Sequence, residues 1–138
     1  MNPDWFSGHV AYSMAKFGMS LCVLGMAAEF KDDGVAVNAL WPRTAIATAA
    51  VKNVLGGEQL VNISRGPEIM ADAAYVILTK PSKEFSGNFC IDDTLLAENG
   101  VSDFSVYADV PFDQLAPDFF VPEDLSLIHI SEPTRPVT

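Results

Sequence analysis

A tyrosine and a lysine stand four residues apart near the start of the chain, at Tyr12 and Lys16. In a helix this spacing places the phenol and the ammonium on one face, one turn apart. A phenol has a reference pKa of about 10 and exchanges protons poorly at neutral pH, but a neighbouring ammonium stabilises the phenolate. The pair is therefore a candidate acid–base centre. The alternative is a solvated surface pair that carries no chemistry.

The sequence around the pair favours a functional role. Lys16 is the only charged residue between His9 and Glu29, in a run rich in Met, Ala and Leu. A lone charged side chain in apolar sequence is expected to face a polar cavity or to have a function, because burying an unpaired charge is costly. The composition predicts a helix over 12–30 that ends near Gly34. We expect a buried helix of a soluble protein rather than a membrane span.

Residues spaced three and four apart divide this helix into two neighbouring stripes. One stripe is a seam of small side chains, which permits another backbone to approach closely. Tight packing against a sheet and a subunit interface explain this seam equally well. The seam comprises Ala11, Ala15, Gly18, Cys22 and Gly25, and the stripe beside it comprises Tyr12, Lys16, Met19, Val23, Met26 and Phe30.

An apolar run over 35–41, closed by Pro42, predicts a strand buried on both faces, as parallel strands are. A helix followed by such a strand indicates a layered α/β fold. The irregular stretch over 44–64 predicts a helical lid with a hinge at Gly56 and Gly57.

Two further elements are expected along the chain. Pro67 and Glu68 predict the start of a helix that begins at Gly66 and runs to about Thr79. The stretch over 86–92 predicts a turn into a final short strand. We expect the folded unit to end near residue 110.

Acidic side chains gather in the last third of the chain. Residues 1–91 hold seven basic and eight acidic side chains, whereas residues 92–138 hold one and ten. A protein with a formal charge of −10 repels the phosphate backbone, so we expect no nucleic-acid partner. The bias predicts a solvated acidic tail.

The two cysteines, Cys22 and Cys90, lie far apart in apolar sequence, which predicts buried thiols of a protein from a reducing compartment. No metal site is expected.

The order of these features resembles the carboxy-terminal half of a short-chain dehydrogenase/reductase domain. The fold this implies is α/β, the carboxy-terminal half of a Rossmann-type doubly wound parallel sheet, here with an irregular acidic tail. The order and spacing of several motifs make the resemblance specific. The residues that carry it are Tyr12-Ser13-Met14-Ala15-Lys16, Val37-Asn38-Ala39-Leu40-Trp41-Pro42, Thr48 and Ser86-Gly87-Asn88-Phe89-Cys90-Ile91-Asp92.

The resemblance implies an oxidoreductase that uses NADP or NAD. Tyr12 and Lys16 would be its catalytic residues and would also contact the cofactor. Tyr12 would exchange a proton with a small apolar carbonyl or secondary alcohol substrate. Lys16 would lower the pKa of the phenol and bind the nicotinamide ribose.

The resemblance also assigns Pro42, Ile46 and Thr48 to cofactor binding. Ile46 would contact the carboxamide through its backbone, and the Thr48 hydroxyl would lie near the pyrophosphate. The sequence departs from the family pattern in two places. Arg43 stands where most of the family has Gly, and Thr48 lies one residue further from Pro42 than is usual.

Parts of the family pattern are not in this sequence. In the family, the Gly-rich turn, the cofactor-selecting residue, an Asn-rich strand and the catalytic Ser precede the Tyr, so we expect a preceding half of about 150 residues. We expect the fragment alone to be inactive, and the full-length protein to be a cytoplasmic homo-oligomer without a membrane span. Residues 1–110 would be the domain half and 111–124 an acidic extended tail. Residues 125–138 resemble the conceptual translation of a sequencing adapter.

Two other functions fit parts of the sequence. The parent protein could be a non-catalytic member that binds dinucleotide or lipid and acts through oligomerisation; the presence of both Tyr12 and Lys16 argues against this, whereas Arg43 leaves room for it. A stand-alone acidic interaction domain would require the whole order of motifs to be a coincidence.

Overall fold

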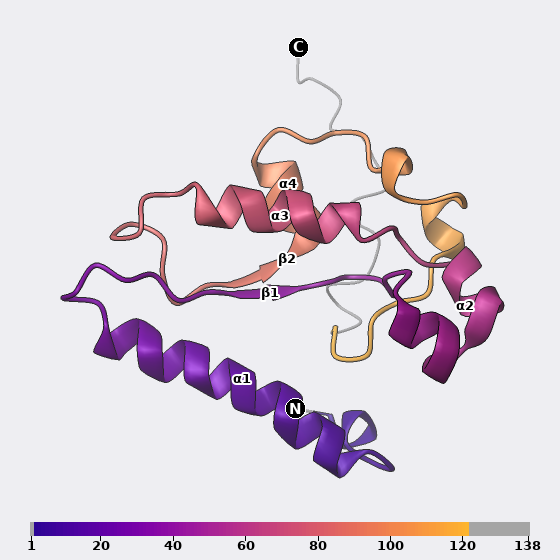
Figure 1. The fold of residues 1–138 in the computed structure, drawn as a ribbon, viewed down its shortest axis with the longest axis horizontal. Helices are drawn as coiled ribbons and strands as arrows, with labels where there is room; N and C mark the ends of the chain where they lie inside the picture. The colour runs from indigo at the N-terminus through magenta and orange to yellow at the C-terminus, as the bar shows by residue number, and fades with distance from the viewer. Residues whose placement is uncertain (1, 122–138) are drawn as a thin grey trace.

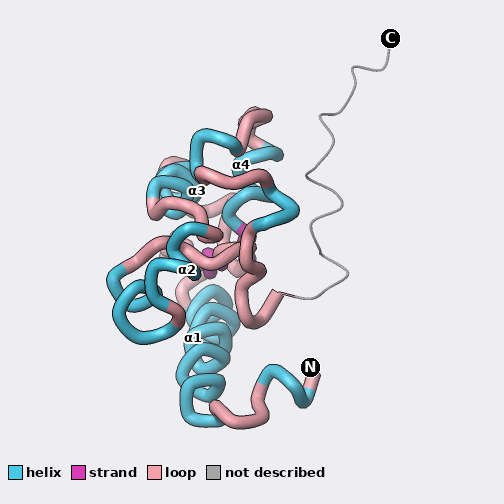
Figure 2. The backbone as a smooth tube through the Cα atoms, turned by 90° about the vertical axis from the view of Figure 1, so that its right-hand side faces the viewer, coloured by secondary structure: helices cyan, strands magenta, loops and turns pink. Residues whose placement is uncertain are grey.

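The computed structural model describes residues 2–121, which form a small layered α/β unit (Figure 1). The helix α1 (Val10–Glu29) lies on one side of a two-stranded sheet, and α3 (Glu68–Leu78) and α4 (Asp92–Glu98) lie on the other. Figure 2, turned by 90°, shows the same order of layers. Helices on both sides of a parallel sheet are the architecture that the sequence predicts.

The sheet consists of β1 (Ala39–Trp41) and β2 (Phe89–Ile91), which run parallel with Leu40 opposite Cys90. The amide side chain of Asn38 extends the pairing, because its Oδ1 accepts hydrogen bonds from the backbone and side-chain nitrogens of Asn88 at 3.1 and 2.9 Å. The first strand is shorter than expected and half-buried rather than buried on both faces. Within residues 2–121 it pairs with β2 alone, which leaves its other edge without a partner strand.

Helix α1 begins at Val10 and is followed by a turn in which Gly34 has φ +70°, as a helix terminator requires. The expectation of a buried helix is wrong for this chain, because only Ser13 and Val23 are buried. The described chain places β1 and the stretch 118–120 against one face of α1 and leaves the rest exposed. By length and composition α1 could cross a membrane, but a single helix of this kind is weak evidence for a membrane span.

The seam of small residues lies on the exposed side of α1. A Cβ added at Gly18 or Gly25 would meet no atom within 4 Å, so the seam makes no tight contact with the described sheet. Cys22 is also exposed, contrary to expectation, whereas Cys90 is buried. Close packing inside this chain therefore does not account for the seam.

The stretch between β1 and α3 is largely helical, as expected for the lid. A π-helical segment, η2 (Val51–Leu55), and the short helix α2 (Gly57–Asn62) meet at the two glycines. Gly57 has φ +63°, a left-handed backbone conformation that residues with a Cβ atom rarely adopt. The predicted hinge therefore coincides with the junction of two helical segments.

The core lies between the strands and the two helices α3 and α4. Ile69 and Ala73 on α3 are fully buried, and Leu95 and Leu96 on α4 are almost so. The sequence prediction missed α4, because the acids Asp92 and Asp93 at its start were attributed to a strand end and a tail. Two acids in the first turn instead suit the positive end of a helix dipole.

Three buried charged side chains form an ion-pair network beside this core. The Asp93 carboxylate is fully buried and accepts from Arg43 Nε at 2.8 Å and from Arg65 Nη1 at 2.7 Å. The Arg65 guanidinium also lies 5.6 Å from the Phe104 ring centroid and 5.2 Å from that of Phe112. One carboxylate therefore joins residues that are 50 and 28 positions away in sequence.

Asp92 adds a second buried carboxylate to the same place. Its Oδ1 accepts from the backbone nitrogens of Arg43 at 3.0 Å and Asp93 at 2.7 Å, while its Oδ2 is buried without a hydrogen-bond partner. Burial, and to a lesser extent the charge of Asp93, raise the pKa of Asp92 to about 6 against the lowering effect of the two backbone hydrogen bonds and of the Arg65 charge.

The stretch from 111 to 121 differs from the expected extended tail. Leu115 and Phe120 are buried, and Thr44 pairs with Pro117 as an antiparallel bridge. The acidic side chains of this stretch are the reason for the wrong expectation, since apolar residues placed between them hold it on the body. The expected artefact over 125–138 lies outside the described residues.

Replacing Asp93 by Ala in the full-length protein should destabilise it by about 3–5 kcal/mol, because two buried guanidinium groups lose their counter-charge. Urea unfolding at pH 7 measures this loss. The matched control is Glu58→Ala, which breaks the exposed Lys52–Glu58 pair and should change stability little. A loss for Asp93→Ala as small as that of the control would contradict the network's structural role.

Replacing Asp92 by Asn should change how stability depends on pH. The folded-state pKa of Asp92 lies above the unfolded value of 3.8, so the folded state binds the proton more tightly, and this contribution is lost as pH rises from about 4 to about 6. Relative to Asp92→Asn, the wild type should lose up to about 3 kcal/mol across that window. Urea unfolding of both proteins at pH 4, 5, 6 and 7 tests this, and parallel stability curves would refute it.

Candidate active site

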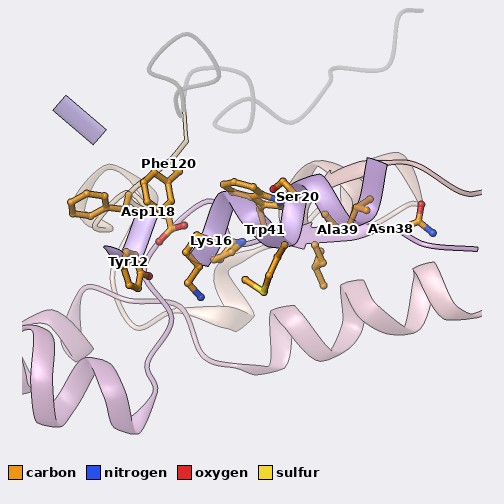
Figure 3. A pocket seen from close by; sticks show the side chains of 13 residues that line it. Tyr12, Lys16, Ser20, Asn38, Ala39, Trp41, Asp118 and Phe120 are labelled. Carbon is orange, nitrogen blue, oxygen red and sulfur yellow. The ribbon is translucent and has the colours of Figure 1, made fainter. Parts of the chain in front are cut away.

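A pocket of about 420 Å³ lies between α1, β1 and the stretch from Asp118 to Phe120 (Figure 3). Its walls are mostly apolar, with polar groups concentrated at a few positions, as is usual for small-molecule sites. Figure 3 shows Tyr12, Lys16, Asp118 and Phe120 gathered at one end, with Asn38 and Ala39 at the other. The lining residues are Tyr12, Lys16, Met19, Ser20, Val23, Asn38, Ala39, Leu40, Trp41, Pro42, Asp118, Phe119 and Phe120.

Tyr12 and Lys16 lie together on the pocket wall, as their spacing predicts. The Lys16 ammonium is 5.5 Å from the centroid of the Tyr12 ring. Tyr12 is 52 % exposed and Lys16 is half-buried, so both side chains are accessible to a ligand. The pair therefore lies at the polar end of a mostly apolar pocket.

The start of α1 is fixed by hydrogen bonds to the turn before it. Ser13, buried beneath Tyr12, has its hydroxyl 3.0 Å from the His9 carbonyl oxygen and 3.2 Å from that of Trp5. The His9 ring nitrogen Nε2 lies 2.5 Å from the same Trp5 oxygen. These contacts hold the first turn of α1, and with it the position of Tyr12.

Phe120 is the centre of an aromatic cluster at the Tyr12 end of the pocket. It is 7 % exposed, and its ring is nearly parallel to that of Tyr12, with the centroids 6.1 Å apart. It makes edge contacts with Phe17 at 5.2 Å and with Trp5 and Trp41 at 6.5 and 6.4 Å. Such pairs each contribute about 0.5–1.5 kcal/mol beyond burial of their area. The cluster fastens the end of the described chain to α1 and β1.

The other residues expected to bind cofactor are placed differently. Pro42 lines the pocket with the catalytic candidates, whereas Ile46 and Thr48 do not. Ile46 is buried beside Arg65, with which it forms a parallel bridge. The Thr48 hydroxyl is exposed and accepts a hydrogen bond from the backbone nitrogen of Val51 at 3.3 Å, which caps the helical stretch that follows.

Asp118 is a pocket residue that the sequence analysis missed. Its backbone nitrogen donates to the Arg43 carbonyl oxygen at 2.8 Å. Burial raises the pKa of its carboxyl, and the Phe119 backbone hydrogen bond and the Lys16 charge oppose that rise. The only signal in the sequence was an acid between Pro117 and the two phenylalanines, which the acidic bias of that region concealed.

The polar groups of the pocket fit part of a nicotinamide cofactor. A phenol and an ammonium side by side can bond to ribose hydroxyls, and the apolar wall can take a planar ring. Residues 2–121 contain no strand followed by a Gly-rich turn that would hold the phosphates. In the same part of the chain, no cluster of three or more His, Cys, Asp or Glu side chains could hold a metal ion.

Two solved structures are similar to this chain in sequence and in fold. A short-chain dehydrogenase homologue from Mycobacterium thermoresistibile is 50 % identical with a TM-score of 0.76, over 88 % of this chain and 43 % of that one. A putative dehydrogenase from Xanthomonas campestris is 50 % identical with a TM-score of 0.80, over 89 % and 44 %. No family model matches the chain. Sequence and fold are nevertheless similar to those of the short-chain dehydrogenase/reductase family, which confirms the resemblance.

Within that family the chain is similar to hydroxysteroid dehydrogenase-like protein 2. The protein from Bos taurus is 55 % identical over 128 residues, which are 93 % of this chain and 30 % of the relative. The Homo sapiens protein is 54 % identical over 123 residues, or 89 % and 29 %. Stretches 41–50 and 117–120 also resemble this branch. The chain spans about 30 % of the length of these relatives, so it corresponds to part of such a protein.

Replacing Phe120 by Ala should open the aromatic cluster and destabilise the full-length protein by about 3–5 kcal/mol. Phe119, which is 54 % exposed, provides the control, and Phe119→Ala should cost far less. Trp5 and Trp41, both in contact with Phe120, should change their fluorescence in Phe120→Ala only. Equal losses of stability in the two variants would contradict the anchoring role.

Proposed function

We propose that this chain provides the acid–base end of the active site of an NAD(P)-dependent oxidoreductase that interconverts small apolar carbonyl compounds and secondary alcohols. The observation that supports it most is the placement of Tyr12 and Lys16 side by side at the polar end of an otherwise apolar pocket. The similarity of the chain to dehydrogenases also supports the proposal.

Each residue of the pair has a distinct role in the proposed reaction. The Tyr12 hydroxyl gives a proton to the substrate oxygen during reduction and takes one during oxidation. The Lys16 ammonium lies beside the Tyr12 ring and bonds to the nicotinamide ribose. A bound nicotinamide supplies the hydride. Trp41 and Phe120 form an apolar wall beside the reacting groups.

Pro42, Ile46 and Thr48 remain proposed cofactor contacts with unequal support. Pro42 borders the same pocket as the acid–base pair. Ile46 and Thr48 follow it on the stretch that leads away from the pocket and do not line it. The proposed contacts remain the Ile46 backbone to the nicotinamide carboxamide and the Thr48 hydroxyl near the pyrophosphate. The departure at Arg43 does not obstruct the pocket, because its guanidinium points to Asp93 and Thr94.

The chain by itself holds only part of the proposed site. The described residues lack a phosphate cradle, and β1 has an edge with no partner strand. We therefore propose that residues 1–124 alone are inactive and that the full-length protein is active as a homo-oligomer. The exposed seam of small residues on α1 is a candidate contact between its subunits.

Replacing Tyr12 by Phe in the full-length protein should lower turnover of small apolar ketones by about 10²–10⁴-fold, because the proton donor is lost while the ring remains. Reduced nicotinamide absorbance measures the rate. Tyr75→Phe removes a hydroxyl from an exposed tyrosine on α3 and should leave turnover unchanged.

Unchanged turnover in Tyr12→Phe would remove Tyr12 from the mechanism. A wild-type protein that binds dinucleotide but turns over neither ketones nor secondary alcohols would instead favour the non-catalytic alternative.

A further inference from the structure

The acid–base end of the pocket holds a negative charge as well as a positive one. Among the residues that line the pocket, Lys16 and Asp118 are the two with charged side chains. They come from different elements, since Lys16 lies on α1 and Asp118 on the stretch that crosses the pocket after Leu115. Figure 3 shows both beside Tyr12.

Asp118 is held in place by the body of the protein. Its backbone nitrogen bonds to the Arg43 carbonyl oxygen, and the Arg43 backbone nitrogen in turn bonds to buried Asp92. The residues on either side are fixed by the Thr44–Pro117 bridge and by the aromatic cluster around Phe120. Asp118 is therefore a fixed pocket group rather than a mobile surface acid.

No ion pair within 4.0 Å joins Lys16 and Asp118 in the described chain, although the charge of Lys16 acts on the Asp118 carboxyl. The neighbouring Arg43 does not neutralise Asp118, because its guanidinium points to Asp93. His9 packs on Phe119, with its ring nitrogen directed to the Trp5 carbonyl. The carboxylate is thus free to interact with a cation that enters beside Lys16.

We propose that Asp118 offsets the charge of Lys16 so that the pocket binds the cationic, oxidised nicotinamide more favourably than Lys16 alone would allow. The proposal rests on the proposed function, because it concerns the cofactor that this function requires. A Lys16 ammonium without a counter-charge would repel a positively charged ring and would not repel the neutral, reduced one. Asp118 removes this penalty from the oxidised form only.

This charge arrangement has a thermodynamic consequence for the bound cofactor. A site that binds the oxidised form more tightly makes the bound reduced form a stronger hydride donor, by linkage of binding and redox equilibria. Asp118 would in this way favour reduction of a carbonyl on the protein, without contact to the substrate. Asp118 contributes a fixed negative charge to the pocket and is neither an acid nor a base in the reaction.

The test is the ratio of two dissociation constants, measured by isothermal titration calorimetry on the full-length protein at pH 8 and fixed ionic strength. The probes are NAD⁺ and NADH, and NADP⁺ and NADPH. Asp118→Asn should weaken binding of the oxidised form by about three- to tenfold relative to the reduced form. Asp118→Glu, which keeps the charge, should retain most of the wild-type ratio. Asp113→Asn removes an exposed acid outside the pocket and should leave the ratio unchanged.

The outcomes separate this inference from the proposed function. If the wild type binds none of the four nucleotides, the proposed function itself fails. If it binds them and Asp118→Asn leaves the ratio within twofold of wild type, or weakens both forms equally, the inference alone is overturned. A change of similar size in Asp113→Asn would also overturn it, because the effect would then be one of net charge.

Discussion

The Asp93 carboxylate between two arginines is the constraint on which the rest of this structure depends. It is fully buried and bonded to Arg43 and Arg65, which come from separate stretches of the chain. A buried charge of this kind is tolerated only when its partners are in place, since desolvation of an unpaired ion costs several kcal/mol. The network therefore brings together α4, the stretch after β1 and the stretch before α3 in one arrangement.

The shape of the pocket depends on that arrangement. The residues around Arg43 and Arg65 are connected by backbone hydrogen bonds, from Arg65 to Ala45 at 3.0 Å and from Ala45 to Ala116 at 2.9 Å. A further backbone hydrogen bond joins Asp118 to this region, from the Asp118 nitrogen to the Arg43 carbonyl oxygen. A charge cluster on one side of β1 thus positions the aromatic and acidic wall that faces Tyr12. The positions of Tyr12 and Lys16 depend only on helical spacing and on the hydrogen bonds of Ser13.

The sequence was sufficient to predict those features that depend on local spacing. Tyr12 and Lys16 fall on one face because four residues make about one helical turn, and Gly34 closes the turn that follows α1 because it can adopt a positive φ. The order of helix, strand and helix also predicted the parallel sheet. Features that depend on distant pairs could not be predicted, because nothing local distinguishes Asp93, 50 residues from Arg43, from a solvated acid. For the same reason Asp118 was assigned to a tail, and the exposure of α1 could not be inferred from its apolar composition.

The buried arginine–aspartate network holds the pocket wall as part of the folded body. Native-state hydrogen exchange of the full-length protein tests this directly, at the amides of Ala45, Arg65, Ala116 and Asp118. If the network acts as described, these amides should exchange as slowly as those in the middle of α3, because they open only with the core. Exchange at the rate of exposed loops, with α3 still protected, would show that the wall opens independently and would contradict the claim.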